Sequence, residues 1–589
     1  MKKILKGAIA SLAIACGICS SDLYAAANIT QYTYTAEETL TTTEKIINGG
    51  TIVYSKPSSV YDFIDEDGNF NSVYTSESNV YWTTFDENME EINTAKMTMY
   101  FDKSNSPVEY HDIITNFGNA LYYNEHLYVV YGRQSSTATE AAFNEVTMAV
   151  IKYDKEGNII AKTDLVGTQL NPTTFMNLGG GDWSYGTSLP FATNANCSLT
   201  INDGIIACFF GRQMFNAHQS SMLFFIDAET LEYVSNKYYT CEENVAKYTE
   251  PGAYYVSHSF FQRIIPTEDG GFLMADSGDA GLKGATRGLN VSKIYPERDI
   301  LKLSTSKMIN YSEGGTGSHG YNYTYSSVGN IIELSDGYMY IGSLQPTLSL
   351  EYGKSISESW EILAQKYTKD FYTKDSVEEM QMFDTQVRTP VGTPPADAAL
   401  GVNASQGRIY LTGEEKDYGI KWLTELNNEH MAILVRAVEI EDDNIAIIWE
   451  QLEMELYNGE YDVWDYDGDV YYMIIDKDAN IVSEPCKIPN VRLNEEEQYV
   501  YKDGKIYWTT TNNKRLTVNV LDIKNPIIKK GDLNQDGLVD SADAAIALNL
   551  YKYNNATEDD LVMGDMDGNG MIDSADAAMI LNVFKYNLR

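Results

Sequence analysis

Short apolar runs, separated by turns rich in Asp, Asn and Gly, fill the chain from about residue 28 to about residue 525. Segments such as NEHLYVVYGRQ, NDGIIACFFGRQ, SDGYMYIGS and KDGKIYWTTT show the pattern. A short apolar run bounded by turn residues is typical of a buried β-strand, and a tight turn between two such runs indicates a hairpin. Most of these hairpins are followed by a second pair of strands, so the pattern predicts a mainly β body.

The strand units recur at steps of roughly 40 to 80 residues, which is the spacing of a repeated β-sheet module. The first unit falls near residues 60–100, and later hairpins start near residues 124, 202, 268, 335, 405, 442 and 502. Four-stranded units repeated around an axis form a β-propeller. We therefore expect residues 28–525 to form a seven- or eight-bladed β-propeller-like module. A multi-sheet sandwich is the alternative that the pattern leaves open.

The pattern changes near the C-terminus, where apolar residues recur at helical spacing. These residues are Ile546, Leu550 and Tyr553, followed by Met579, Val583 and Tyr586. The spacing predicts two helices, the first ending near Asn554. Residues 526–589 are therefore expected to form a small all-α module that follows the body with almost no linker.

Each predicted helix follows a loop, and the two loops are near copies that begin GDLNQDGLVDSADAA at Gly531 and GDMDGNGMIDSADAA at Gly564. Calcium takes roughly six to eight oxygen ligands, which a loop supplies from positions 1, 3, 5, 7, 9 and 12 around a glycine at position 6. Position 7 contributes its backbone carbonyl, so it can be apolar. The predicted ligands are Asp532, Asn534, Asp536, Leu538, Asp540 and Asp543 in the first loop, and Asp565, Asp567, Asn569, Met571, Asp573 and Asp576 in the second. Metal-free turns rich in Asp and Asn are the alternative.

These two loop–helix copies resemble the type I dockerin of cellulosome-forming bacteria. The resemblance implies two calcium ions, a small fold that needs them, and a partner, the cohesin module of a scaffoldin. The partner-binding residues that it implies are Ser541, Ala542, Asn549 and Lys552 in the first copy, and Ser574, Ala575, Asn582 and Lys585 in the second. Because both copies carry the same residues, we expect either helix to dock after a half-turn rotation. Helix capping by the serines and solvation of the lysines are the alternatives.

The composition narrows the possible partners. The chain has 84 acidic and 43 basic residues and a formal net charge of -41, which excludes nucleic acid and anionic lipid as favoured partners. Its 44 Tyr, 19 Phe and 7 Trp argue against disorder, because disordered chains contain few aromatic residues.

Residues 1–27 are typical of a secretory signal peptide. Lys2, Lys3 and Lys6 precede an apolar run that is too short to span a bilayer, and small residues follow at Ala25–Ala27. A lipoprotein signal ending at Cys16 is the alternative. No later segment is long and apolar enough to span a membrane. We therefore expect a protein that is secreted to an extracellular or cell-surface complex.

The body offers one local group of polar residues with catalytic potential. Its candidates are His258, Asp276, Asp279 and Arg287. A carboxylate and a histidine within reach of each other can perform acid–base chemistry on a sugar. The alternative is that each of these side chains only makes structural hydrogen bonds.

The setting implied by the dockerin resemblance is plant-polysaccharide breakdown. The body is then a hydrolase or a lyase, or alternatively a non-catalytic carbohydrate-binding or structural module.

Four cysteines lie beyond the predicted signal peptide, at Cys197, Cys208, Cys241 and Cys486. Their spacing is not that of a zinc site. Cys197 and Cys208 are expected either to form a bridge, if they lie on neighbouring strands, or to be buried free thiols.

Overall fold

The computed structural model describes residues 27–43, 59–76, 78–98, 114–134, 146–166, 189–190, 196–213, 219–234, 257–279, 287–294, 309–310, 326–344, 360–369, 420–426, 430–457, 460–463, 468–494, 498–524, 530–533 and 539–587. The strand unit expected near residue 405 and residues 1–26 of the predicted signal peptide lie outside these ranges.

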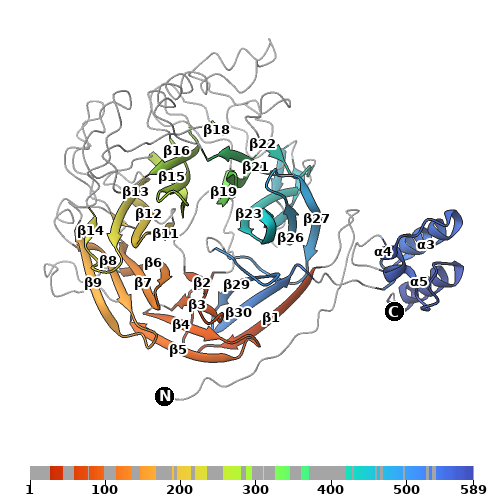
Figure 1. Cartoon of the computed structure of the whole chain (residues 1–589), viewed down its shortest axis with the longest axis horizontal. Helices are drawn as coiled ribbons and strands as arrows, with labels where there is room; N and C mark the ends of the chain where they lie inside the picture. Colours follow the sequence, from red (N-terminus) through yellow and green to blue (C-terminus); the bar gives the residue numbers. More distant parts are fainter. Residues whose placement is uncertain are drawn as a thin grey trace, which may run out of the picture.

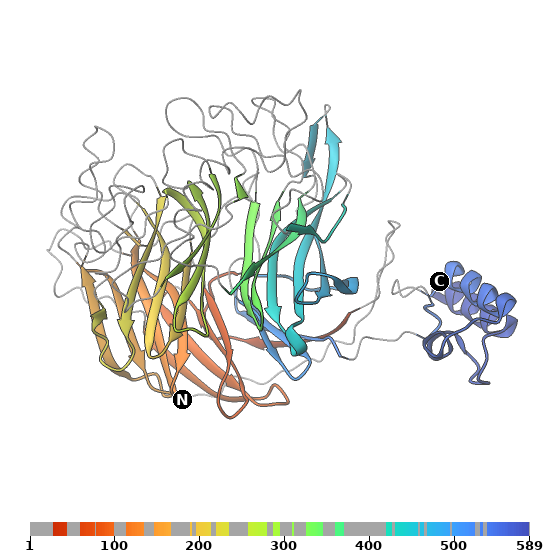
Figure 2. The same cartoon turned by 45° about the horizontal axis from the view of Figure 1, so that its top comes forward.

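Antiparallel sheets stand around a common centre in the order of the sequence, as the blades of a propeller do (Figure 1). The first contains β2 (Val60–Ile64), β3 (Phe70–Thr75), β4 (Asn79–Phe85) and β5 (Glu91–Thr98). The second contains β6 (Ile114–Tyr123), β7 (His126–Gln134), β8 (Val146–Tyr153) and β9 (Ile159–Val166). Within these two sheets the strands pair in sequence order, and their first strands, β2 and β6, lie nearest the centre (Figure 1). Figure 2 shows the sheets of the ring side by side in a tilted view.

The next sheet has nine strands and follows the chain through two blades. The third blade of the ring contains β10 (Leu189–Pro190), β11 (Cys197–Asn202), β12 (Ile205–Gln213), β13 (Gln219–Asp227) and β14 (Tyr233–Val234). The fourth blade contains β15 (Ser257–Pro266), β16 (Phe272–Asp279), β17 (Arg287–Ile294) and β18 (Ile309–Asn310). A single registered pair, Ser220↔Ser257, joins the two blades.

Two further sheets continue the ring. One contains β19 (Ser326–Leu334), β20 (Gly337–Leu344), β21 (Glu361–Thr368) and β22 (Ile420–Trp422). The other contains β23 (His430–Glu439), β24 (Ile445–Tyr457), β25 (Glu460–Val463), β26 (Asp469–Ile475) and β27 (Ile481–Ile488), with the 3-10 turn η5 (Glu441–Asp443) between its first two strands.

The last sheet combines the two ends of the body. It contains β28 (Val500–Lys502), β29 (Lys505–Asn512), β30 (Arg515–Asp522) and β1 (Asn28–Thr35). The register of β1 against β30 is unbroken from Asn28↔Asp522 to Thr35↔Arg515. The first strand of the body therefore completes the last blade and closes the ring.

The mainly β propeller fold is confirmed, but the described residues form six hydrogen-bonded sheets, fewer than the expected seven or eight blades. The difference arises because hydrogen bonding joins the blades β10–β14 and β15–β18 into one sheet.

Both faces of the inner strands are buried, because each blade packs against a neighbour on either side. On β7, Val129 packs in the cluster shared with the first blade, and the next residue, Val130, packs in the cluster shared with the third. On β24, Ile447 and Ile448 divide in the same way between two clusters. This arrangement explains the continuous apolar runs VVY and IAIIW, since a strand with one solvated face would alternate.

Aspartates at the hairpin turns fix the turn geometry. Asp65, Asp154 and Asp476 each accept backbone N–H groups from the residues two and four positions later, at 2.8–3.1 Å. Each side chain thereby replaces backbone partners in a tight turn. The Asp- and Asn-rich turns of the sequence are thus the hairpin turns of the blades.

A helical region follows the ring and lies beside it in Figure 1. It contains α3 (Ser541–Tyr553), α4 (Glu558–Gly564) and α5 (Ser574–Asn587). Ala547 and Ile580, on α3 and α5, are fully buried in a common apolar cluster. The predicted helix end near Asn554 is confirmed, since this residue caps α3 in the left-handed conformation. Tyr553 and Met579 are exposed rather than part of the core.

Among the described residues, no helix is long and apolar enough to cross a membrane.

We predict that deleting residues 28–35 lowers the melting temperature of the body by roughly 10 °C or more, because it exposes β30 and the buried side chains of Leu516 and Val518. Differential scanning calorimetry measures the change. Deleting residues 530–589 is the matched control, and it should leave the body transition unchanged. An unchanged transition after the first deletion would show that the ring does not depend on β1.

Candidate functional site

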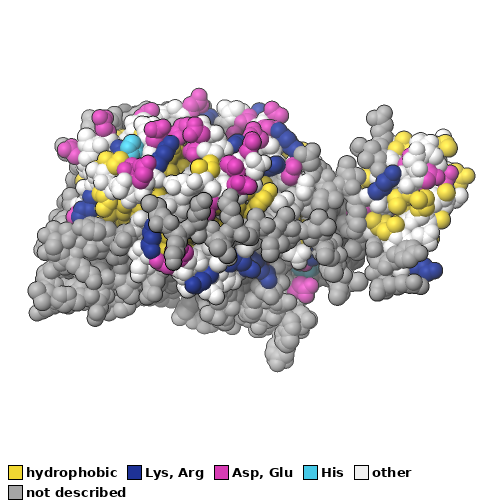
Figure 3. All heavy atoms as spheres, turned by 90° about the horizontal axis from the view of Figure 1, so that it is seen from below, with side chains coloured by type: hydrophobic (Ala, Val, Ile, Leu, Met, Phe, Trp, Pro, Cys, Tyr) yellow, Lys and Arg dark blue, Asp and Glu magenta, His cyan; other side chains and the backbone are white. Residues whose placement is uncertain are grey.

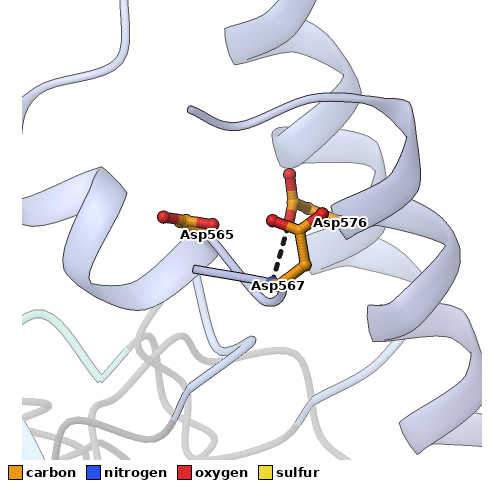
Figure 4. A group of neighbouring side chains, drawn as sticks. All are labelled: Asp565, Asp567 and Asp576. Atoms are coloured by element: carbon orange, nitrogen blue, oxygen red, sulfur yellow. Dashed lines mark hydrogen bonds between the residues drawn. The ribbon is translucent and has the colours of Figure 1, made fainter. Parts of the chain in front are cut away.

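Three carboxylates converge in the second loop of the C-terminal region. The side chains of Asp565, Asp567 and Asp576 each offer an oxygen, and these oxygens lie within 4.8 Å of one another (Figure 4). Asp565 and Asp576 are buried, whereas Asp567 is exposed. Like charges at this separation repel each other, so the arrangement favours a bound cation. An all-oxygen ligand set suits calcium.

Asp576 organises the loop from the first turn of α5. Its Oδ1 accepts the backbone N–H of Met566 at 2.7 Å and that of Asp567 at 3.3 Å. Its Oδ2 accepts the N–H of Asp573 at 2.8 Å. The side chain is fully buried, and it holds both ends of the loop against the start of the helix.

The first loop repeats this framework at the equivalent positions. Asp543, also fully buried, accepts the N–H of Leu533 through Oδ1 and the N–H of Asp540 through Oδ2, both at 2.8 Å. Asp540 in turn accepts the N–H of Ala542 at 2.6 Å, as Asp573 accepts that of Ala575 in the second loop. The sequence repeat is thus also a repeat of hydrogen bonds.

The turn of the second loop encloses Asp565. Its oxygens accept the N–H groups of Gly568, Asn569 and Gly570 at 2.7–3.0 Å. The hydrogen bond from Gly570 is the largest cause that lowers the pKa of Asp565 below its usual value, so the carboxylate is kept charged. Gly570 has a φ of 86°, which agrees with the glycine expected at position 6.

The other predicted ligands are placed only in part. Asn569 Oδ1 accepts the N–H of Met571 at 2.9 Å, and the Met571 side chain is exposed, so only its carbonyl is suited to bind a metal. Asp532 is buried at the start of the first loop. Asn534, Asp536 and Leu538 lie outside the described residues. The ligand roles of all twelve residues stay predictions.

Helix α4 was not expected from the sequence pattern. It ends at Gly564, directly before Asp565, so the second loop has a short entering helix. Thr557 and Asp560 form a capping box at its start, with reciprocal side-chain to backbone hydrogen bonds at 2.7 and 3.1 Å. The Thr-x-x-Asp spacing is a sequence signature of a helix start and could have revealed this helix.

Residues 530–584 match the family model of the Dockerin type I domain. The C-terminal module is a type I dockerin.

All the partner-binding residues expected in the dockerin are exposed. They are Ser541, Ala542, Asn549 and Lys552 in the first copy, and Ser574, Ala575, Asn582 and Lys585 in the second. Ser541 and Ser574 are the first residues of α3 and α5. The N-cap of α3 is Asp540, so Ser541 does not cap this helix.

Apolar side chains are also exposed on the dockerin helices. Leu548, Tyr551 and Leu581 are 45%, 55% and 43% exposed. Figure 3 shows apolar side chains over the described dockerin surface, whereas acidic side chains are frequent over the described face of the body. The dockerin thus has a less charged surface than the body on this side.

A comparison with curated proteins found no match. Among solved structures, the chain is similar to Drosophila Plexin A in complex with Semaphorin 1b, at 10% identity and a TM-score of 0.33, covering 79% of this chain and 87% of that chain. It is also similar to the GH93 alpha-L-arabinofuranosidase of Fusarium graminearum in complex with arabinobiose, at 7% identity and a TM-score of 0.34, covering 83% and 99%. A third likeness is to polysaccharide lyase Uly1, at 8% identity and a TM-score of 0.31, covering 69% and 90%. These values are too low to transfer an activity to the body.

The candidate catalytic residues of the body lie on three adjacent strands. Asp279 is opposite Ser257 on β15 and opposite Arg287 on β17, and His258 directly follows Ser257. The register thus places His258, Asp279 and Arg287 at the same end of one blade. Asp276 lies three residues before Asp279 on β16 and is fully buried. The catalytic role of these four residues stays a prediction.

A cavity of about 100 Å³ lies among the inner strands of the ring. Its polar lining includes Asn119, Asn196, Ser198, Arg263 and Asn330, which come from β6, β15, β19 and the segment that begins β11. None of the described residues that line it is an Asp or a Glu. Acid–base chemistry by a pair of carboxylates therefore has no support from this cavity lining.

Hydrogen bonds between neighbouring inner strands hold the wall of this cavity. Asn119 Nδ2 donates to the carbonyl of Cys197 at 2.8 Å, and Asn196 Nδ2 donates to that of Gln262 at 3.0 Å. Arg263 Nε donates to the Gly329 carbonyl at 2.8 Å. Each of these bonds joins one blade to the next, so the polar lining has a structural role. Sequence reasoning missed the asparagines because nothing in their local sequence shows which strand lies beside them.

We predict that Asp576→Asn removes calcium from the second loop and leaves the first loop filled, because the change replaces a charged oxygen with an amide N–H. Calcium bound per chain should fall from two to one in equilibrium dialysis. Asp543→Asn should do the same through the first loop. Lys585→Ala, at an exposed position on α5, is the control. Two ions bound by Asp576→Asn would contradict the ligand assignment.

Proposed function

We propose that this protein is a secreted component of a cellulosome-type complex, which binds the cohesin module of a scaffoldin through its dockerin. Two calcium ions, one in each loop, stabilise the dockerin in its binding-competent fold. The observation that carries the proposal is the repeated framework of Asp543 and Asp576, together with the family match of residues 530–584. A metal-bound loop fixes the start of each helix, where the expected partner-binding serines stand.

The proposal includes two modes of docking. Ser541 and Ser574 occupy equivalent first positions of α3 and α5, and both are exposed. Lys552 and Lys585 lie in the last turns of the same helices. A half-turn rotation of the module would exchange the two sets, so one cohesin surface can accept either helix.

We expect Ser541→Asp or Ser574→Asp alone to weaken cohesin binding by about two-fold, because one of two equivalent modes is lost. Both changes together should weaken it by about 100-fold, since a charge then stands at the centre of either interface. Asp is well tolerated in the first turn of a helix, so the fold should survive. Isothermal titration calorimetry with a panel of type I cohesins measures the effect.

Excess chelator should abolish binding by the unmodified chain, and added calcium should restore it. Equal binding with and without chelator would contradict the calcium-dependent part of the proposal. A large loss in one single variant and none in the other would contradict the two docking modes but not cohesin binding itself.

We further propose that the body acts on plant polysaccharide, as a hydrolase or a lyase. The dockerin supports this setting, because the complexes that dockerins build break down such polymers. His258, Asp279 and Arg287 share one end of a blade and are the candidates for the chemistry. The second candidate function is non-catalytic carbohydrate binding on the same complex.

Incubating the full chain with a panel of plant polysaccharides separates these functions. For an enzyme, we expect new reducing ends, accompanied by ultraviolet absorbance if the cleavage is by a lyase. Asp279→Asn and His258→Ala should each lower the rate by about 100-fold, the usual size of an acid–base contribution. Glu156→Gln, in an exposed hairpin turn, is the control. Retention on a polymer without any product would favour the binding module.

A further inference from the structure

Two cysteines of the body stand on neighbouring strands. Cys197 begins the inner strand β11 and is registered opposite Phe210 of β12, while Cys208 of β12 is registered opposite Leu199. The two cysteines are therefore diagonal neighbours across an antiparallel pair. Both belong to the apolar cluster between this blade and the preceding one, so their side chains lie on the same face of the sheet.

The two sulfur atoms are in contact. Sγ of Cys197 lies 3.6 Å from Sγ of Cys208, and both residues are fully buried. The third described cysteine, Cys486, belongs to a different cluster, between other blades. Pairing is thus favoured within this one pair among the described cysteines, because a disulfide needs its partners on adjacent backbone with their side chains directed at each other.

We propose that Cys197 and Cys208 form an intrachain disulfide in the mature protein. Two thiols lose two protons and two electrons, one S–S bond forms, and a thiol–disulfide oxidant outside the cytoplasm accepts the electrons and is reduced to its dithiol. The proposal rests on the secretion proposed above, because disulfides persist in oxidising compartments. It does not depend on cohesin binding or on any activity of the body.

The bridge forms before the blade closes over it. Burial raises the pKa of the Cys208 thiol well above its usual value, so almost no thiolate is present once the strands have packed. Thiolate is the form that attacks a disulfide, and the buried pair is closed to an external oxidant. Oxidation therefore occurs while β11 and β12 are pairing, and the finished bridge resists reduction in the folded protein.

The position of the bridge gives it a structural consequence at the centre of the ring. Cys197, Ser198 and Leu199 form part of the cavity wall, and the carbonyl of Cys197 accepts the inter-blade hydrogen bond from Asn119. A covalent link from Cys197 to β12 would fix this short inner strand to its own blade.

The test uses the full chain secreted from a host with an oxidising export pathway. The protein is unfolded in guanidinium without reductant, treated with iodoacetamide, and analysed by peptide mass spectrometry. We expect the peptides of Cys197 and Cys208 to be found joined and lacking two hydrogen atoms, with Cys486 alkylated. In Cys208→Ala, Cys197 should become alkylated, whereas in the control Cys486→Ala the joined peptides should remain.

A stability measurement gives an independent readout. Reduction in guanidinium followed by refolding with reductant should lower the melting temperature of the unmodified chain by about 3 °C, and it should not change that of the variant Cys197→Ala/Cys208→Ala. Complete alkylation of both cysteines in the unreduced protein, or a link from either one to Cys241 or Cys486, would overturn the proposal. Either result would leave cohesin binding, and so the proposed function, unaffected.

Discussion

Burial of both faces of the blades is the constraint on which the body depends. Neighbouring residues such as Val129 and Val130 point into different inter-blade clusters, so no blade has a complete core of its own. Each sheet needs two neighbours, and a row of such sheets has exposed apolar ends unless it closes. The pairing of β1 with β30 closes the ring and covers these ends. No additional structural element is needed, because the first and last strands of the body belong to one sheet.

The constraint on the dockerin is its size, because so small a domain gains little stability from its apolar core. Its apolar core is a single small cluster, in which Ala544, Ala547 and Ala577 contribute little buried area. Order therefore has to come from the loops, where buried Asp543 and Asp576 bind backbone N–H groups at both ends of each loop. The carboxylates that arrange the backbone also bring negative charge together, and a divalent cation resolves that conflict.

The sequence predicted what is encoded locally. Turn residues placed the hairpins at residues 124–125, 335–336 and 503–504, and the loop repeat placed the starts of both dockerin helices. It did not predict that β1 belongs to the last blade, because the segment NITQYTYT reads only as a strand and its partner lies almost five hundred residues away. It also missed the inter-blade bonds of Asn119 and Asn196, which depend on which strands become neighbours. The polar residues grouped around His258 were chosen by nearness in sequence, and the structure distributes them between a buried position and one end of a blade.

The place of β1 also sets the order in which the body can mature. The strand that completes the final sheet leaves the ribosome first, and its partner β30 leaves last. Until then the earliest strand has no permanent neighbour, and closing a loop that spans the whole body carries an entropy cost that slows folding. A chain exported before synthesis ends would therefore cross the membrane with its ring still open, and the dockerin would emerge only after the last blade.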